Sequence, residues 1–407
     1  MSQATPEAPQ PAVPQIRPTA TTIAYYGAFI ALGLSLATLG PTLPALAGQT
    51  GVTLKGISYL FTTRSLGYLL GSLNGGRLFD RMPGHALIAS TLVATAVLLA
   101  LVPQATTLWF LCTIMFFLGA AEATVDVGGN VLLVWIHRDN LGPYMNALHF
   151  FFGVGALISP IIVGQVVAAT GGISWAYWLV SLLVLPPAVA LFRLRSPSNP
   201  VHSDEAKPVR TRPLLVFLLS FCFFLIVGAE VGFADWLYTY ALEMGLATES
   251  AAAYLTSAFW GAFTIGRLVM IPIASRLRPS TILVGDLIGC ILGIGIIASW
   301  PNDSTFLWVG TAVFGLAIAS VFATLFSLAN DHLSISGSMT SWFFVGTSAG
   351  AMALPWTIGQ FFESSGPPVT TTVIMVDLLI ALVVFGAALL YARARPAADT
   401  EASGANA

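Results

Sequence analysis

Long apolar segments, broken only by short polar stretches, dominate the sequence. A helix needs about 20 residues to cross the hydrocarbon of a bilayer, and each segment is long enough for one crossing. We therefore predict an all-α membrane protein with twelve transmembrane helices, in segments 22–47, 55–79, 84–103, 107–136, 141–169, 173–193, 212–243, 249–277, 280–300, 304–331, 335–363 and 368–394.

The composition excludes the main classes of soluble protein. Of the 407 residues, 56% are hydrophobic and only 8% are charged, whereas soluble domains have about 25% charged residues. A nucleic-acid-binding protein would need a basic face, and a transmembrane β-barrel would show alternating segments of roughly 10 residues. The partner that the composition predicts is the lipid bilayer, and no nucleic acid.

Enzymatic motifs are also missing from the sequence. There is no H-E-x-x-H and no P-loop, and these are usual signs of a metal or nucleotide site. We expect no enzyme and no bound cofactor. We also expect a monomer.

The longest polar stretch divides the apolar segments into six and six. The expected domains are a disordered cytoplasmic tail at 1–21, an amino-terminal six-helix half at 22–193, a cytoplasmic linker at 194–211, a carboxyl-terminal six-helix half at 212–394 and a cytoplasmic tail at 395–407.

Basic residues orient these segments, because cytoplasmic loops of membrane proteins carry an excess of Lys and Arg. With the amino terminus inside, Lys55 is the one basic residue in an outer loop. Both termini are therefore expected in the cytoplasm, in a plasma membrane such as a bacterial inner membrane. Thirteen basic residues then lie on the inner side: Arg17, Arg77, Arg81, Arg138, Arg193, Arg195, Lys207, Arg210, Arg212, Arg276, Arg278, Arg393 and Arg395.

An internal repeat relates the two sets of six segments. Sliding the chain against itself by 195 residues aligns the pattern P-x-x-x-G-Q at 160–165 with the same pattern at 355–360. A glycine follows at the same distance in both copies. Two parallel repeats of this kind place a substrate site near the middle of the membrane, between the halves.

One motif resembles the loop between helices 2 and 3 of the major facilitator superfamily. Residues 75–85 read G-G-R-L-F-D-R-M-P-G-H, and Gly76, Asp80 and Arg81 match the family's G-x-x-x-D-R-x-G-R/K. An echo in the second half includes Arg276 but lacks the Asp. The resemblance implies the major facilitator fold and a gating role for these four residues. The alternative is a plain positively charged turn.

The ionisable residues inside apolar segments are functional candidates, because charges are costly in a bilayer. Glu122, Asp126 and Asn130 are spaced four residues apart and lie along one helix face. Two carboxylates one turn apart favour uptake of a proton or a Na⁺ ion. We therefore predict cation coupling through Asp126, with Glu122 assisting and a Na⁺ site at Asp126. The alternative is that these acids pair with an arginine as a structural lock.

The remaining intramembrane groups lie on other segments. Glu230 is a second candidate for cation coupling, and His149 is a candidate for binding substrate or protons. Arg64 and Arg267 are the two basic residues within spans. Either can neutralise a buried carboxylate or contact an anionic substrate, and the first is favoured because two arginines accompany several acids.

Three stretches resemble a narrower branch of the superfamily, the fucose/proton symporters and the sodium-dependent glucose transporter-like proteins. They are residues 125–135, the following 144–156, and 228–236, which reads G-A-E-V-G-F-A-D-W. In the fucose symporters, the positions of Asp126 and Asn130 hold the helix-4 acid and the amide that follows it, and that of His149 holds a sugar-contacting glutamine. Their helix-1 acid has no counterpart here, so the glucose transporter-like group fits better.

This resemblance implies Na⁺ or H⁺ symport of a hexose-like sugar by alternating access. A sugar site needs polar groups for the hydroxyls and aromatic plates for the ring face. Two alternatives stay open, a proton-driven multidrug antiporter and a non-transporting membrane sensor. The candidates for substrate binding are Asn130, His149, Glu230, Gln165, Gln360, Phe151, Trp236, Trp260 and Trp342.

Overall fold

The computed structural model describes residues 18–137, 141–197, 212–333 and 337–394. Parts of the expected tails and linker, at 1–17, 198–211 and 395–407, lie outside the described ranges. Within the described ranges the chain forms α-helices and one short 3-10 helix, and no strand. The prediction of an all-helical membrane protein is confirmed.

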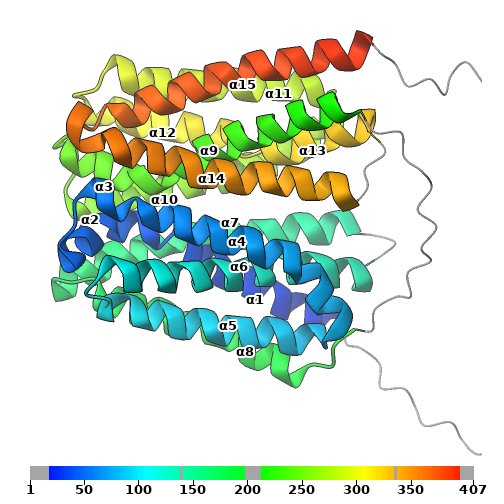
Figure 1. Cartoon of the computed structure of the whole chain (residues 1–407), viewed down its shortest axis with the longest axis horizontal. Coiled ribbons are helices and arrows are strands. Elements are labelled where there is room, and N and C mark those ends of the chain that lie inside the picture. The colour runs from blue at the N-terminus through cyan, green and yellow to red at the C-terminus, as the bar shows by residue number, and fades with distance from the viewer. Residues whose placement is uncertain (1–17, 138–140, 198–211, 334–336, 395–407) are drawn as a thin grey trace, which may run out of the picture.

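The helices follow one another with short connections (Figure 1). In chain order they are α1 (Pro18–Leu36), α2 (Leu39–Thr50), α3 (Leu54–Ile57), α4 (Tyr59–Arg81), α5 (Gly84–Leu101), η1 (Val102–Gln104), α6 (Leu108–Ile136), α7 (Leu141–Thr170), α8 (Ser174–Arg193), α9 (Pro213–Glu243), α10 (Glu249–Ala274), α11 (Pro279–Ser299), α12 (Ser304–Ile318), α13 (Val321–His332), α14 (Gly337–Ser365) and α15 (Val369–Ala394).

Ten stretches of the described residues are long and apolar enough to cross a membrane. Two of the segments expected from sequence are missing from this set, 55–79 and 335–363, which correspond to α4 and α14. Both helices have ample length, but they carry many polar and small residues. They pack against each other, so part of their surface faces protein and needs less apolar character.

Three of the expected segments consist of two α-helices each: 22–47 (α1 and α2), 55–79 (α3 and α4) and 304–331 (α12 and α13). The first breaks between α1 and α2, where Pro41 has no N–H to donate to the carbonyl of Ala37. The segment at 304–331 breaks between α12 and α13, where the Ser320 hydroxyl donates to the carboxylate of Asp286. Such breaks expose backbone polar groups inside the bundle, where side chains can bind them.

The long helices lie side by side, with the amino-terminal helices α1–α8 below and most of the carboxyl-terminal helices α9–α15 above in Figure 1. The described ends of the chain, at α1 and α15, lie on the same side of the bundle. We call this side the terminal end and the opposite side the distal end. The distal end holds Gly171 and Gly366, which are related by the 195-residue repeat and have positive φ of 75° and 78°.

Close helix packing also follows the repeat. A Cβ added at Gly155 of α7 would lie 2.1 Å from the carbonyl oxygen of Ile30 in α1. Its repeat mate Gly350, in α14, would meet the carbonyl oxygen of Phe224 in α9 at 1.9 Å. Small residues at both places let the helix backbones approach closely.

Candidate functional site

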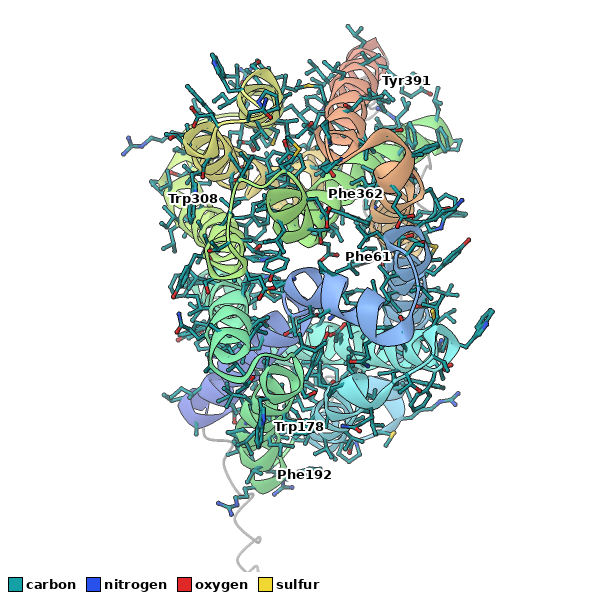
Figure 2. All side chains as sticks on the ribbon, turned by 90° about the vertical axis from the view of Figure 1, so that its left-hand side faces the viewer. Phe61, Trp178, Phe192, Trp308, Phe362 and Tyr391 are labelled. Carbon is teal, nitrogen blue, oxygen red and sulfur yellow. The ribbon has the colours of Figure 1, made fainter. Side chains whose placement is uncertain are left out.

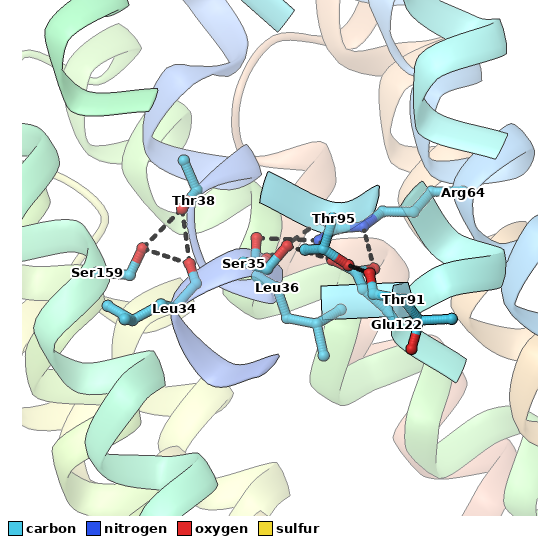
Figure 3. Close-up of polar contacts among 9 residues, drawn as sticks. All are labelled: Leu34, Ser35, Leu36, Thr38, Arg64, Thr91, Thr95, Glu122 and Ser159. Atoms are coloured by element: carbon cyan, nitrogen blue, oxygen red, sulfur yellow. Dashed lines mark hydrogen bonds and ion pairs between the residues drawn. The ribbon is translucent and has the colours of Figure 1, made fainter. Parts of the chain in front are cut away.

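The first buried charged group is an ion pair between α4 and α6, shown in Figure 3. Arg64 donates from Nη2 to Oε1 of Glu122 at 2.5 Å and from Nε to Oε2 at 3.0 Å. The hydroxyl of Ser35 donates to Oε1 of Glu122 at 2.5 Å. The side chains of Arg64 and Glu122 are only 8% and 1% exposed. We call these three residues the Arg64 cluster.

The helix break between α1 and α2 completes the Arg64 cluster. The guanidinium also donates to the carbonyl oxygens of Ser35 at 3.0 Å and Leu36 at 3.3 Å, at the end of α1. Thr38 and Ser159 hold the same turn, because both hydroxyls donate to the carbonyl oxygen of Leu34 (Figure 3). The broken helix thus supplies acceptors that a continuous helix would have used itself.

This geometry supports the alternative in which Glu122 pairs with an arginine as a structural lock. Both of its carboxylate oxygens already accept hydrogen bonds from protein side chains, two of them from Arg64. A buried, bidentate and fully hydrogen-bonded pair holds its geometry firmly. In this state Glu122 is a structural partner of Arg64, and its role in cation coupling stays a prediction.

Asp126 lies one turn further along α6 and has a different set of partners. The Tyr68 hydroxyl donates to Oδ2 of Asp126 at 2.5 Å. The Asn130 amide donates to Oδ1 at 3.0 Å and to the Asp126 backbone carbonyl at 2.9 Å. Asp126 is half-buried. The shared helix face expected for Asp126 and Asn130 is therefore used for a direct contact between them.

The sequence reasoning missed Tyr68, although a signal for it existed. Arg64 and Tyr68 are four residues apart on α4, as Glu122 and Asp126 are on α6. The helices run in the same direction and pack together, so equal spacings bring two successive pairs into contact. If Arg64 pairs with Glu122, the equal four-residue spacings on the two helices predict that Tyr68 contacts Asp126.

Two groups from the carboxyl-terminal helices extend this set of charges. Arg267 of α10 and Glu230 of α9 interact electrostatically with each other, and Arg267 also interacts with Asp126 and His149. The guanidinium carbon of Arg267 lies 4.6 Å from the centre of the Phe263 ring. We call Asp126, Tyr68, Asn130, Glu230 and Arg267 the Asp126 cluster. It draws residues from both sets of helices.

His149 and Phe151 lie near this region on α7. The His149 ring stands edge-on to Phe29, with ring centres 5.8 Å apart. Phe151 stacks on Tyr26 at 4.8 Å. Both side chains are half-buried, so each retains some free surface. Their roles in substrate binding stay predictions.

The tryptophan candidates divide into buried and exposed residues. Trp236 is fully buried, donates its indole N–H to the carbonyl oxygen of Pro355 at 2.9 Å, and stacks on Phe362 at 4.7 Å. Its ring is covered in this state, and its role in substrate binding stays a prediction. Trp260 is 8% exposed and packs edge-on against Phe152. Trp342 is 61% exposed and lies near the terminal end of α14.

The two glutamines join the amino-terminal and carboxyl-terminal helices at the distal end. Gln165 of α7 donates to the hydroxyl of Tyr254 in α10. Its repeat mate Gln360, in α14, donates to the Ser58 hydroxyl at 3.2 Å and to the Lys55 carbonyl oxygen at 3.4 Å. In this state both amides connect helices, and their roles in substrate binding stay predictions.

Further contacts close the distal end. Glu363 accepts a hydrogen bond from the Leu54 backbone N–H at 3.0 Å. Phe61 of α4 and Phe362 of α14 lie against Trp236, and Figure 2, which looks onto the distal end, shows them where the two sets of helices meet. The hydrogen bonds described between the two sets thus gather at this end.

The residues of the expected gate lie at the terminal end. Arg81 is the last residue of α4 and is exposed, and Arg276 is exposed just beyond α10. The burial of Gly76 and the side chain of Asp80 lie outside the described part of the structure. The gating role stays a prediction.

The comparison with protein families identifies the fold. A model of the Major Facilitator Superfamily matches residues 25–355. The chain belongs to the major facilitator superfamily. A solved structure of the nucleoside transporter NupG (D323A mutant) supports the fold, with a TM-score of 0.71 over 92% of this chain and 99% of that one. At 15% identity it carries no information on substrate.

The relatives of this superfamily member are transporters. Sodium-dependent glucose transporter 1 of Xenopus laevis is 33% identical over 80% of this chain and 72% of its own length. Sodium-dependent glucose transporter 1A of Mus musculus is 31% identical over 82% and 88%. The protein is therefore a membrane transporter and not an enzyme, as expected from its sequence.

Proposed function

We propose that this superfamily member couples the transport of a hexose-like sugar to Na⁺. The observation that carries the proposal is the Asp126 cluster, which gathers two carboxylates and one guanidinium from both sets of helices. The relatives named sodium-dependent glucose transporter support the choice of ion and sugar. We expect the ion and the sugar to be cargo rather than bound cofactors.

The charge of the cluster supports cation coupling. With Asp126, Glu230 and Arg267 all ionised, the cluster has one excess negative charge. Leaving such a charge inside a membrane is costly, and one bound cation removes it. The cation-loaded cluster is neutral, which favours the movement of the loaded site through the bilayer. Binding and movement are thus linked by the same charge.

We further propose twelve membrane spans in two pseudo-symmetric halves. The ten apolar spans together with α4 and α14 make twelve. Repeat mates support the symmetry: a Cβ at Gly164 would meet Ala253, and one at its mate Gly359 would meet Ser58, the mate of Ala253. The terminal end is then cytoplasmic, since it carries most of the basic residues.

Alternating access follows from this arrangement. The contacts at the distal end close the outer side in the described state, and the Asp126 cluster would be reached from the cytoplasm. Rocking of the halves about the cluster would break the distal contacts and open the other side. The glutamine and Glu363 contacts are the ones that must separate.

Uptake of labelled glucose into proteoliposomes tests the proposal. We expect accumulation above equilibrium under an inward Na⁺ gradient, and none when choline replaces Na⁺ or when a proton gradient acts alone. Glucose uptake driven by protons alone would reassign the ion. Failure to take up any hexose, with proton-driven efflux of lipophilic dyes, would favour the drug antiporter instead.

A further inference from the structure

Arg267 is a half-buried cation with a hydrogen-bond donor that the described protein does not use. Its Nε is buried and has no hydrogen-bond partner among the described residues. An unsatisfied charged donor in a membrane interior is costly. Something other than the described protein atoms is expected to satisfy it.

Arg64 shows how the same chain treats an arginine that has a structural role. Its Nε, Nη1 and Nη2 all donate, to Glu122 and to two backbone carbonyl oxygens. Arg267 has two carboxylates within electrostatic range, Asp126 and Glu230, but forms no hydrogen bond with either. The contrast separates a locked arginine from one that is free to bind a ligand.

The surroundings of Arg267 limit the kind of ligand. The guanidinium carbon lies over the ring of Phe263 at 4.6 Å. Such stacking uses the face of the guanidinium and leaves the N–H groups at its edge free. The two neighbouring carboxylates leave an excess negative charge, which repels an anion. A neutral ligand with several adjacent acceptor oxygens suits this site.

We propose that Arg267 binds the sugar directly, by donating to two neighbouring hydroxyl oxygens of the hexose. This proposal rests on the proposed sugar transport and names the residue that recognises the substrate. The planar fork of an arginine matches a pair of acceptors on adjacent carbons. Arg267 also attracts Asp126 and Glu230. The residue that binds the sugar therefore also affects the electrostatic potential at the cation site.

The test combines variants of Arg267 with deoxy analogues of glucose in proteoliposomes. Arg267→Lys keeps the charge but loses the fork, so we expect the KM for glucose to rise about tenfold or more, since charge-assisted hydrogen bonds are lost. The half-saturating Na⁺ concentration should change by less than about twofold, because the charge stays. Arg64→Lys is the matched control for a general loss of packing.

The analogues locate the hydroxyls that Arg267 binds. In the wild-type protein, removing a bound hydroxyl should raise KM. In Arg267→Lys the same removal should have a much smaller effect, because the partner is already gone. In Arg64→Lys the full effect of each removal should remain. The thermal stability of each variant is measured in the same detergent.

The outcomes separate this inference from the proposed function. Wild-type protein without Na⁺-driven hexose uptake would contradict the proposed function itself. Wild-type uptake with an unchanged pattern of deoxy-sugar effects in Arg267→Lys would overturn the role of Arg267 alone. Should Arg267→Lys not fold, Arg267→Gln is measured instead, and a retained dependence on every hydroxyl would again overturn the proposal.

Discussion

Gly40 of α2 lies directly against Asp235 of α9. A Cβ added at Gly40 would lie 3.0 Å from both the Cα and the carbonyl oxygen of Asp235. The two positions are 195 residues apart, so each is the repeat mate of the other. Two mates in a symmetric pair of halves can touch only near the symmetry axis. The Gly40–Asp235 contact therefore supports an axis that passes between α2 and α9.

A methyl group at this contact should weaken the closed distal end. In Gly40→Ala, we expect α2 and α9 to separate and the distal-open state to gain population, since the methyl meets backbone atoms that cannot rotate away. A cysteine placed at Ala253, which is buried beside Gly164 between α10 and α7, should then react faster with a membrane-impermeant maleimide.

Gly48 provides the control on the same helix, because a Cβ there meets no neighbouring atom within 4 Å. Gly48→Ala should leave the labelling rate unchanged. Equal rates for both alanine variants would contradict an obligatory close approach at Gly40.

Loss of one partner of the Arg64–Glu122 pair should destabilise the protein more than loss of both partners. Arg64→Met leaves the Glu122 carboxylate buried and unpaired, which we expect to lower the free energy of unfolding by about 3–5 kcal/mol. The double variant Arg64→Met, Glu122→Leu removes both charges and should recover most of that loss. Thermal denaturation in detergent measures both. A double variant as unstable as Arg64→Met would contradict the account.

The sequence predicted the fold more fully than the site. Segment ends agree with helix ends within a few residues at most places, because apolar length is read directly from the chain. The repeat at 195 residues also anticipated real contacts, such as Gly164 with Ala253 and Gly359 with Ser58. Both features, the length of apolar segments and the internal repeat, are patterns along the sequence itself.

Pairing between distant helices could not be predicted in the same way. Trp236 is a residue type that often stacks on sugar rings. Its indole N–H nevertheless donates to the carbonyl oxygen of Pro355, and its ring stacks on Phe362. Glu122 and Asp126 are both acids in the same apolar segment, but only Glu122 forms a bidentate pair with Arg64. Which partner a polar group finds depends on helix rotation, which hydropathy does not record.

Trp236 should act through packing rather than through substrate. Trp236→Phe leaves the carbonyl oxygen of Pro355 without its buried donor, at a cost of about 1–3 kcal/mol. We expect a lower melting temperature in detergent, while the KM for glucose in proteoliposomes stays within about twofold of wild type. A large rise in KM at unchanged melting temperature would restore the substrate role.

His137 should make the terminal end sensitive to acid. Its ring stacks on Tyr144 at 3.6 Å and bonds the Thr22 hydroxyl at 2.7 Å, and burial lowers the pKa of His137 below its usual value. As the pH falls through the ordinary histidine range, the unfolded chain takes up a proton before the folded one. The free energy of unfolding should therefore decrease as the pH is lowered through that range.

The variant His137→Phe keeps an aromatic ring beside Tyr144 but cannot titrate. We expect the melting temperature of the wild type to fall more steeply than that of the variant between neutral and mildly acidic pH. Parallel curves for the two proteins would rule out His137 as the source of the slope.

The central claim is that the carboxylate of Asp126 couples the cation to the sugar. The most direct measurement compares Na⁺-driven accumulation with glucose counterflow in proteoliposomes of Asp126→Asn. The account predicts that accumulation is lost while counterflow exchange persists, because the neutral amide no longer needs a cation to move. Accumulation of glucose by Asp126→Asn at the wild-type level would contradict it.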